Sequence, residues 1–403
     1  MRARRAGRRR TEPGSYFVIV FAGLRRFAFS WIVLCLVAAL AAARPAAALE
    51  TLARQAILVE EATGAVLLEK NADELMAPSS MSKLMTVYMV FERLAEGTLA
   101  LDDTFLVSEK AWRKSGSKMF VEVGKRVTVE DLLRGIIVQS GNDACIVVAE
   151  GLSGSEEAFA AEMTERGREI GLRASVFKNS SGWPEEGHVM TARDLAWLAH
   201  RTIRDFPQYY HYYAETSFTY NGIRQGNRNP LLYRDMGADG LKTGHTVAAG
   251  HGLVASSERD GRRLILVING LEGPNARLRE AERLLDYGYR AFGTYALFEN
   301  GATVTDADVW LGDAPTVPLV IENDLAVTLL RAARRKMEVK VVFEGPVPAP
   351  IARGEPIAKL VVSAPGTAPI EVPLVAGADV GKLSMFRRLG AAIGYLVWGS
   401  ESP

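Results

Sequence analysis

Residues 78–91 read Pro-Ser-Ser-Met-Ser-Lys-Leu-Met-Thr-Val-Tyr-Met-Val-Phe, a run that is apolar on nearly every face of a helix. Such a helix is expected inside a domain, where a lysine in the first turn is rare without a function. Ser80 and Lys83 lie three residues apart and therefore on one face. A serine hydroxyl becomes a nucleophile when a neighbouring base takes its proton, and burial together with a second cation lowers the pKa of a lysine toward that role. The segment predicts a reactive serine.

Two further motifs follow this pair along the chain. Ser140-Gly141-Asn142 precedes a helical run over 143–150, and Lys242-Thr243-Gly244 precedes an apolar run toward 253–255. The Ser-x-x-Lys spacing recurs at 115/118 and 175/178, but no buried helix would hold either of those pairs. A Lys-Thr-Gly triplet arises by chance in fewer than roughly one chain in ten of this size. The ordered trio therefore indicates a site.

Each of the two later motifs has a predicted chemical task. On a turn, Ser140 can relay a proton and the Asn142 amide can orient a substrate carbonyl. Lys242-Thr243-Gly244 is expected on a strand at the edge of a cleft, where Gly244 would admit a peptide backbone as an added strand. Lys242 would supply the second positive charge near Lys83. The backbone N–H groups of Ser80 and His245 would stabilise an oxyanion.

These three motifs resemble those of the penicillin-binding fold. Within that fold, the sequence is similar to the low-molecular-weight D-alanyl-D-alanine carboxypeptidases, which are serine peptidases that trim peptidoglycan stem peptides. The resemblance lies in residues 78–83, 138–144, 227–232 and 239–246 and extends over almost the whole chain after the leader. It implies that Ser80 is acylated, Lys83 is the base, Ser140 relays the proton and Asn142 holds the acyl amide.

A carboxypeptidase also has to recognise a free carboxylate, and the guanidinium fork of arginine fits one. The resemblance implies that Arg228 and Arg279 perform this task beside Thr243. The segment Gly273–Ala276 departs from the expected spacing, so Arg277 is an alternative to Arg279.

The expected function is a serine-type D-Ala-D-Ala carboxypeptidase that removes the terminal D-alanine from stem pentapeptides through a Ser80 acyl-enzyme and is inhibited by penicillins. A close variant is an endopeptidase that cuts cross-links. The alternatives are a β-lactamase, which would need a Glu-x-x-x-Asn loop that does not occur between Ser140 and Lys242, and a non-catalytic wall-binding protein on the same fold.

The expected fold class is α+β, a β-lactamase/transpeptidase-like catalytic domain followed by a small all-β sandwich domain and an amphipathic helix. The corresponding boundaries are a leader over 1–48, the peptidase domain over 49–298, the β domain over 299–376 and a tail over 377–403. The β domain is predicted from short β-branched segments between turn residues, at Val317–Ile321, Val339–Phe343, Leu360–Val362 and Ile370–Leu374.

The N-terminal 48 residues have the layout of a secretory signal peptide. They hold nine arginines and one acid, Glu12, with an apolar run at Phe27–Ala43 and Ala46-Ala47-Ala48 before the predicted cleavage. An uncleaved anchor, helped by Tyr16–Leu24, is the alternative. The remaining chain has 39 basic and 46 acidic residues, a net charge of −7, which argues against nucleic acid as a partner. We expect an exported, periplasmic protein.

Residues 382–398 repeat apolar side chains at helical intervals with basic residues between them. The apolar stretch is too short to span a bilayer, so we expect it to lie in the interface on the outer face of the cytoplasmic membrane, anchored by Tyr395 and Trp398. The alternative is a helix that docks on its own protein.

The other reactive residue types point to no further chemistry. The histidines show no metal-ligand spacing, so His200 and His211 are interpreted as surface or core residues and His188 as structural. Cys145 is expected to be a small buried apolar residue. No metal or organic cofactor is implied. The expected partners are peptidoglycan stem peptides, β-lactams and the membrane surface.

Overall fold

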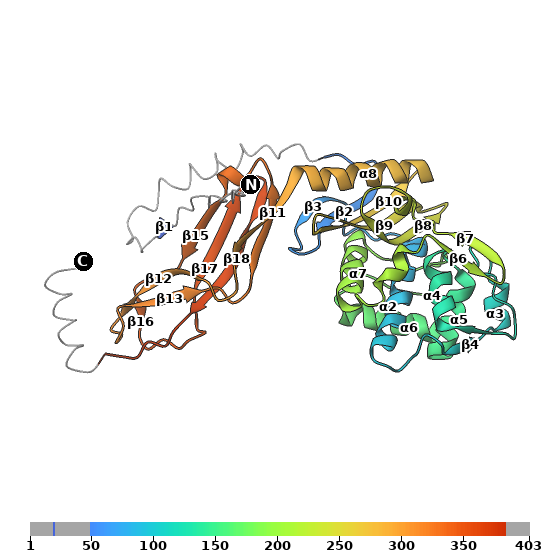
Figure 1. Cartoon of the computed structure of the whole chain (residues 1–403), viewed down its shortest axis with the longest axis horizontal. Coiled ribbons are helices and arrows are strands. Elements are labelled where there is room, and N and C mark those ends of the chain that lie inside the picture. Colours follow the sequence, from blue (N-terminus) through green and yellow to red (C-terminus); the bar gives the residue numbers. More distant parts are fainter. Residues whose placement is uncertain (1–18, 21–48, 384–403) are drawn as a thin grey trace, which may run out of the picture. The chain divides into compact units, whose positions relative to one another are not determined.

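The computed structural model describes residues 19–20 and 49–383 and divides the chain into two compact units, with the boundary between Phe292 and Gly293. Each unit is shown in Figure 1. The expected cleavage after Ala48 and most of the expected tail helix lie outside the described residues. Among the residues that are described, no helix combines the length and the apolar character needed to cross a membrane.

The first unit is built on a five-stranded antiparallel sheet with strand order β3-β2-β10-β9-β8. Its strands are β2 (Gln55–Glu60), β3 (Val66–Lys70), β8 (Ala238–Thr246), β9 (Gly250–Arg259) and β10 (Arg262–Leu271). The middles of β9 and β10 are buried without alternation, because helices cover both faces of the sheet. The helix α8 (Pro274–Ala291) packs on one face, while α2 (Lys83–Ala95) and α7 (Ala192–Asp205) contact the other (Figure 1). Strand β8 is an edge strand and leaves one side open beside the helices.

The helix α2 (Lys83–Ala95) is the centre of the helical layer, and ten of its thirteen residues are buried, which confirms the prediction. The segment before it is a 3₁₀ turn, η1 (Ser79–Ser82), rather than the first turn of the helix. Side chains three residues apart eclipse in a 3₁₀ turn, so this geometry brings Ser80 and Lys83 together more closely than an α-helix would.

Four of the surrounding helices begin with a side chain that caps the first turn. Each of these side chains accepts a hydrogen bond from a backbone N–H of that turn, and they belong to Ser108, Thr128, Ser155 and Thr191. The helices of this layer are α3 (Glu109–Arg113), α4 (Val129–Ile137), α5 (Asn142–Ser153), α6 (Glu156–Glu169) and α7 (Ala192–Asp205). The short elements are β4 (Thr104–Leu106), β5 (Arg126–Thr128), η2 (Tyr210–Ala214), β6 (Ser217–Tyr220), β7 (Ile223–Gly226) and η3 (Pro230–Tyr233).

The second unit is an all-β domain, as expected. Its larger sheet has the order β1-β15-β17-β18-β13-β12-β16, in which β1 (Ile19–Val20) pairs in parallel with β15, and β11 pairs with β14 in a second sheet. The elements are β11 (Phe292–Phe298), β12 (Thr303–Trp310), β13 (Thr316–Val320), β14 (Leu325–Leu330), η4 (Arg334–Lys336), β15 (Glu338–Val342), β16 (Val347–Pro348), β17 (Pro356–Ala364) and β18 (Thr367–Ala376).

The four β segments expected from the sequence fall in or along β13, β15, β17 and β18. Alternate residues of β17 pack inward, including Leu360 and Val362, and join Leu319, Val327 and Leu374 in one core. The boundary of this unit lies at the start of β11, because that strand pairs with β14 inside the domain.

Candidate active site

The first pair of candidate residues meets at the junction of η1 and α2. Lys83 is fully buried, whereas Ser80 is partly exposed. The Lys83 Nζ lies 2.9 Å from the Ser80 Oγ. The hydroxyl can therefore meet a ligand from solvent while the amine behind it stays dry.

Lys83 is held in place by two carbonyl oxygens from distant segments. Its Nζ donates to the Asn142 Oδ1 at 2.8 Å and to the Ser181 carbonyl at 2.5 Å. A neutral amine has two N–H donors and one lone pair. Lys83 can therefore keep both carbonyl bonds after it loses a proton and turn its lone pair toward the Ser80 hydroxyl. These contacts are therefore compatible with Lys83 acting as the base for Ser80.

Burial is the main reason that the pKa of Lys83 is lowered to about 8. The Cys145 thiol and the Asp143 carboxylate oppose this shift, while the positive charges of Arg228 and Lys114 add to it. With this pKa, roughly a tenth of Lys83 is neutral at pH 7 and about half at pH 8.

Lys242 lies on β8 and is also buried, and its Nζ donates to the Thr243 carbonyl at 3.1 Å. Burial lowers the pKa of Lys242 well below its usual value, and the charge of Lys83 lowers it further. Repulsion between two positive charges is mutual, so Lys83 and Lys242 depress each other's pKa, in line with the second positive charge expected near Lys83. Arg228 and Lys114 lower the pKa of Lys83 as well.

Asn142 opens α5 and uses its side-chain amide within the protein. Its Oδ1 accepts from Lys83, and its Nδ2 donates to the Ser115 carbonyl at 3.0 Å. The next residue, Asp143, accepts from the backbone N–H groups of Met119 and Phe120, each at 2.9 Å. Asp143 thereby fixes the loop over 115–121 beside the site. Sequence reasoning missed this residue, although an acid in the first turn of a helix was a visible signal.

Ser140 is buried and adopts a left-handed backbone conformation with φ 62°. Such a conformation is costly for serine and persists only where the surrounding structure enforces it. Within the described part of the chain, the Ser140 Oγ has no hydrogen-bond partner. The hydroxyl is therefore available to a bound ligand.

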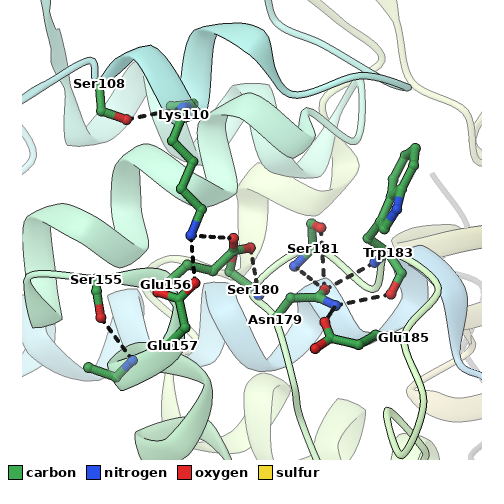
Figure 2. A network of polar contacts seen from close by, with 12 residues as sticks. Ser108, Lys110, Ser155, Glu156, Glu157, Asn179, Ser180, Ser181, Trp183 and Glu185 are labelled. Carbon is green, nitrogen blue, oxygen red and sulfur yellow. Dashed lines mark hydrogen bonds and ion pairs between the residues drawn. The ribbon is translucent and has the colours of Figure 1, made fainter.

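The segment over 179–183 supplies the Ser181 carbonyl and is held by the polar network in Figure 2. The Asn179 Oδ1 accepts from the backbone N–H groups of Ser181 at 3.2 Å and Trp183 at 3.0 Å. The Ser180 hydroxyl donates to Glu156 at 2.8 Å, and Glu156 in turn lies 3.3 Å from the Lys110 Nζ (Figure 2). The network holds the Ser181 carbonyl oxygen in place. Because this oxygen belongs to the backbone, no residue motif in the sequence indicated it.

Glycines allow this segment and β8 to approach η1 closely. A Cβ on Gly182, whose φ is +72°, would lie 1.9 Å from the Ser79 carbonyl oxygen. A Cβ on Gly244 would lie 3.0 Å from the Met81 Cγ and 3.1 Å from the Pro78 carbonyl oxygen. Gly244 was expected to make room for a substrate backbone; its contacts show that it makes room for η1.

The two neighbours of Gly244 on β8, Thr243 and His245, differ in their exposure to solvent. Thr243 is buried, whereas His245 is exposed and stacks on His251 of β9 with 3.9 Å between the ring centroids. Trp183 is 40% exposed, and the Lys114 ammonium lies 4.9 Å from the centre of its ring. The site is thus bordered by β8 on one side and the 115–121 and 179–183 segments on the other.

The structure brings one of the two expected arginines to the site. Arg228 donates to the Ser117 hydroxyl, and its charge acts on both Lys83 and Lys242. Arg279 is exposed on α8. The alternative, Arg277, is buried and its charge lowers the pKa of Lys242, while its Nε has no partner among the described residues.

Helical periodicity explains the difference between the two arginines of α8. Arg277 shares the buried face with residues three, four and seven positions further on, which are Glu280, Ala281 and Leu284. Arg279 falls on the opposite side. The packing of α8 on β9 and β10 decides which arginine turns inward.

Cys145 and His188 have structural environments. Cys145 is fully buried, as predicted, and burial raises the pKa of its thiol to about 12. His188 is buried, its Nδ1 accepts from the Lys178 N–H at 3.2 Å, and burial lowers its pKa to about 4. A thiol and a neutral imidazole of this kind are packed groups rather than reactive ones.

Comparison with known proteins agrees with this geometry. Residues 41–272 match the family model described as D-alanyl-D-alanine carboxypeptidase, and residues 292–382 match that of the penicillin-binding protein 5 C-terminal domain. The D-alanyl-D-alanine carboxypeptidase DacC of Escherichia coli K12 is 36% identical over 84% of this chain and 86% of its own length.

Two solved structures extend the comparison. Penicillin-binding protein 5 from Haemophilus influenzae is 34% identical with a TM-score of 0.76 and covers 83% of this chain and 98% of its own. Penicillin-binding protein D2 from Listeria monocytogenes in its ampicillin-bound form is 28% identical with a TM-score of 0.55 and covers 60% of this chain and 99% of its own. Because a family model spans more than half of the sequence and relatives cover most of both chains, this protein belongs to the low-molecular-weight penicillin-binding D-alanyl-D-alanine carboxypeptidases, which are serine peptidases.

Proposed function

We propose that this protein removes the terminal D-alanine from peptidoglycan stem pentapeptides, with Ser80 as nucleophile and Lys83 as its base. The observation that supports these roles most directly is the 2.9 Å contact between the Ser80 Oγ and a fully buried Lys83 whose pKa is lowered to about 8. A positioned base with a pKa near the working pH is the most effective kind.

The reaction begins when neutral Lys83 takes the Ser80 proton and the Ser80 oxygen attacks the carbonyl of the penultimate D-alanine. The backbone N–H groups of Ser80 and His245 stabilise the oxyanion. The Ser140 hydroxyl passes a proton to the departing D-alanine amine, a role supported by its burial and its free hydrogen-bonding capacity. Water then hydrolyses the ester and restores Ser80.

Recognition of the terminal carboxylate is assigned to Arg228, Arg277 and Thr243. The unpartnered Nε of the buried Arg277 supports this choice over Arg279, because a buried guanidinium without a protein partner gains most from a bound anion. Lys242 adds positive charge beside the same carboxylate. Asn142 keeps Lys83 in position and offers its amide edge to the acyl side of the substrate.

Penicillins would acylate the same serine. A relative with this fold has been solved in an ampicillin-bound form, and a β-lactam carries both an acyl carbonyl and a carboxylate for the groups described above. The proposed difference from a β-lactamase lies in deacylation, which would be slow here. Rapid turnover of a chromogenic cephalosporin would instead favour the β-lactamase alternative.

The proposed location is the periplasm, at the outer face of the cytoplasmic membrane. The support is the leader over 1–48 and the amphipathic pattern over 382–398. In this proposal both the peptidase domain, which ends at Phe292 rather than at the expected residue 298, and the β domain after it lie outside the membrane. Fractionation of cells with and without residues 382–403 tests it, because loss of the tail should release the protein from the membrane fraction.

Two assays on purified protein test the catalytic proposal. A fluorescent penicillin should label the chain covalently, and a pentapeptide ending in D-Ala-D-Ala should release free alanine. Ser80→Ala should abolish both signals. Ser115→Ala is the matched control, because Ser115 belongs to another Ser-x-x-Lys pair, is exposed and offers the site only its backbone oxygen. Alanine release that persists in Ser80→Ala would overturn the assignment.

A further inference from the structure

The β domain carries an uneven distribution of charge. Residues 293–383 contain eleven acidic and eight basic residues, and four of the eight basic ones fall within the six residues Arg331-Ala-Ala-Arg-Arg-Lys336. The acids are spread over the rest of the domain. An otherwise acidic domain thus concentrates its positive charge in one short turn, which we call the basic turn (Arg331, Arg334, Arg335 and Lys336).

The structure presents these side chains to solvent. All four are exposed, and η4 holds three of them in consecutive positions between β14 and β15. The Arg334 guanidinium lies over the Tyr295 ring at 4.3 Å. Within residues 49–383, Arg335 and Lys336 form no ion pair, and the nearby Glu338 is engaged with Lys340 at 2.6 Å. The positive charge of Arg335 and Lys336 is therefore not neutralised inside the domain.

The basic turn lies at one end of the β17–β18 hairpin. Glu338, two residues after η4, pairs with Ser363, and the hairpin turns between Ala364 and Thr367. The chain leaves toward the tail from the other end, where Pro356 pairs with Val375 and Ile351 bridges Val380. The eight-residue step along β17 separates the two ends by about 26 Å. The last described residues, up to Leu383, thus leave the domain at the end away from the basic turn.

We propose that the basic turn is a non-catalytic binding surface for the carboxylate-rich peptidoglycan polymer. This inference rests on the proposed function, in which every uncut stem peptide ends in a free carboxylate. The polymer repeats such anions at short intervals. A single exposed ion pair contributes little, but a cluster of cations facing a repeating array of carboxylates engages several at once. The position of the turn, at the end of the domain away from the last described residues, favours this polymer over an anionic lipid surface.

Binding of this kind raises the local concentration of stem peptides around the catalytic unit without a role for the basic turn in the chemistry. It also predicts salt sensitivity, because the contacts are exposed and screened. Hydrolysis of a soluble pentapeptide should be unaffected, whereas association with the insoluble polymer should depend on the turn.

The test measures sedimentation of the full exported chain, carrying Ser80→Ala to prevent turnover, with purified peptidoglycan sacculi. Arg335→Ser/Lys336→Ser should weaken binding about fivefold, the size expected for the loss of two exposed ionic contacts. Arg353→Ser/Lys359→Ser is the matched control, since it removes two exposed positive charges from the same domain and should leave binding unchanged. Amidation of the sacculus carboxylates should remove the difference between the two variants.

Equal sedimentation of both double variants would overturn the proposal. It would also be overturned if the basic-turn variant lost binding to vesicles of phosphatidylglycerol and phosphatidylethanolamine but kept its binding to sacculi. Penicillin labelling of the same double variants, made with Ser80 intact, checks that they fold. Failure of the parent chain, with Ser80 and the basic turn intact, to label would refute the catalytic proposal separately, because sedimentation does not depend on acylation.

Discussion

The catalytic unit and the β domain place their cations in opposite environments. Lys83, Lys242 and Arg277 are buried around one site, where burial lowers the pKa of each lysine. In the β domain, Lys359 pairs with Glu371 at 3.0 Å while both side chains stay more than half exposed. A desolvated charge is costly to keep and is available for chemistry, whereas a hydrated one contributes solubility and weak contacts. Cationic side chains therefore have different roles in the two units.

The largest expected difference between the two units comes from the removal of one lysine from each. Lys83→Ala should slow acylation by a fluorescent penicillin about a thousandfold, because the serine loses its base. Lys359→Ala should leave the acylation rate unchanged and alter the free energy of unfolding by less than about 0.5 kcal/mol. The acylation rate and a urea titration measure the two effects. Similar losses of acylation in both variants would break the comparison.

Glycines provide the second test. Gly182→Ala should destabilise the catalytic unit by about 3 kcal/mol, since the new Cβ meets the Ser79 carbonyl oxygen and φ is positive. Gly354→Ala in the β domain has a similar φ of +84° but nothing within 4 Å of the new Cβ, so it should cost about 1 kcal/mol. Thermal unfolding of each variant measures the difference, and equal shifts in Tm would contradict the close packing of 182 on η1.

The two arginines of α8 sharpen the comparison within one helix. Arg277→Gln should lower kcat/KM for the pentapeptide about a hundredfold, because a buried charge-assisted contact to the substrate carboxylate is lost. Arg279→Gln should leave kcat/KM close to the parent value, since Arg279 is exposed. Steady-state hydrolysis measures both. A larger loss in Arg279→Gln would restore the original sequence-based choice.

The pH dependence of acylation tests the buried lysine of the catalytic unit without any substitution. Lys83 must be neutral to act, and its pKa is lowered to about 8. The acylation rate should therefore rise up to about tenfold per pH unit below 8 and level off above it. Stopped-flow labelling between pH 6 and 10 follows this curve. A rate that is flat across that range would remove Lys83 as the titrating base.

The residues of the site that could be predicted from the sequence are those that lie only a few positions apart along the chain. Ser80 and Lys83 are three residues apart, and the buried helix that follows was visible in its apolar run. Asn142 could be placed at the start of a helix by the same reasoning. The Ser181 carbonyl could not, because a backbone oxygen has no residue identity and reaches Lys83 only through the network around Asn179. The contributions of Arg228 and Lys114 to the pKa of Lys83 could not be predicted either, since they depend on how distant segments pack around the amine.

By itself, the amino-acid sequence determined the ordered motifs, the buried helix, the all-β character of the second unit and the family to which the chain is similar. Local spacing and apolar pattern are sufficient for these features, because they depend on neighbours along the chain. Only the tertiary structure decided which arginine of α8 turns inward, how Asp143 holds the 115–121 loop and which cations act on Lys83. Those features depend on contacts between segments that are distant in sequence, where helix start points and packing set the distances.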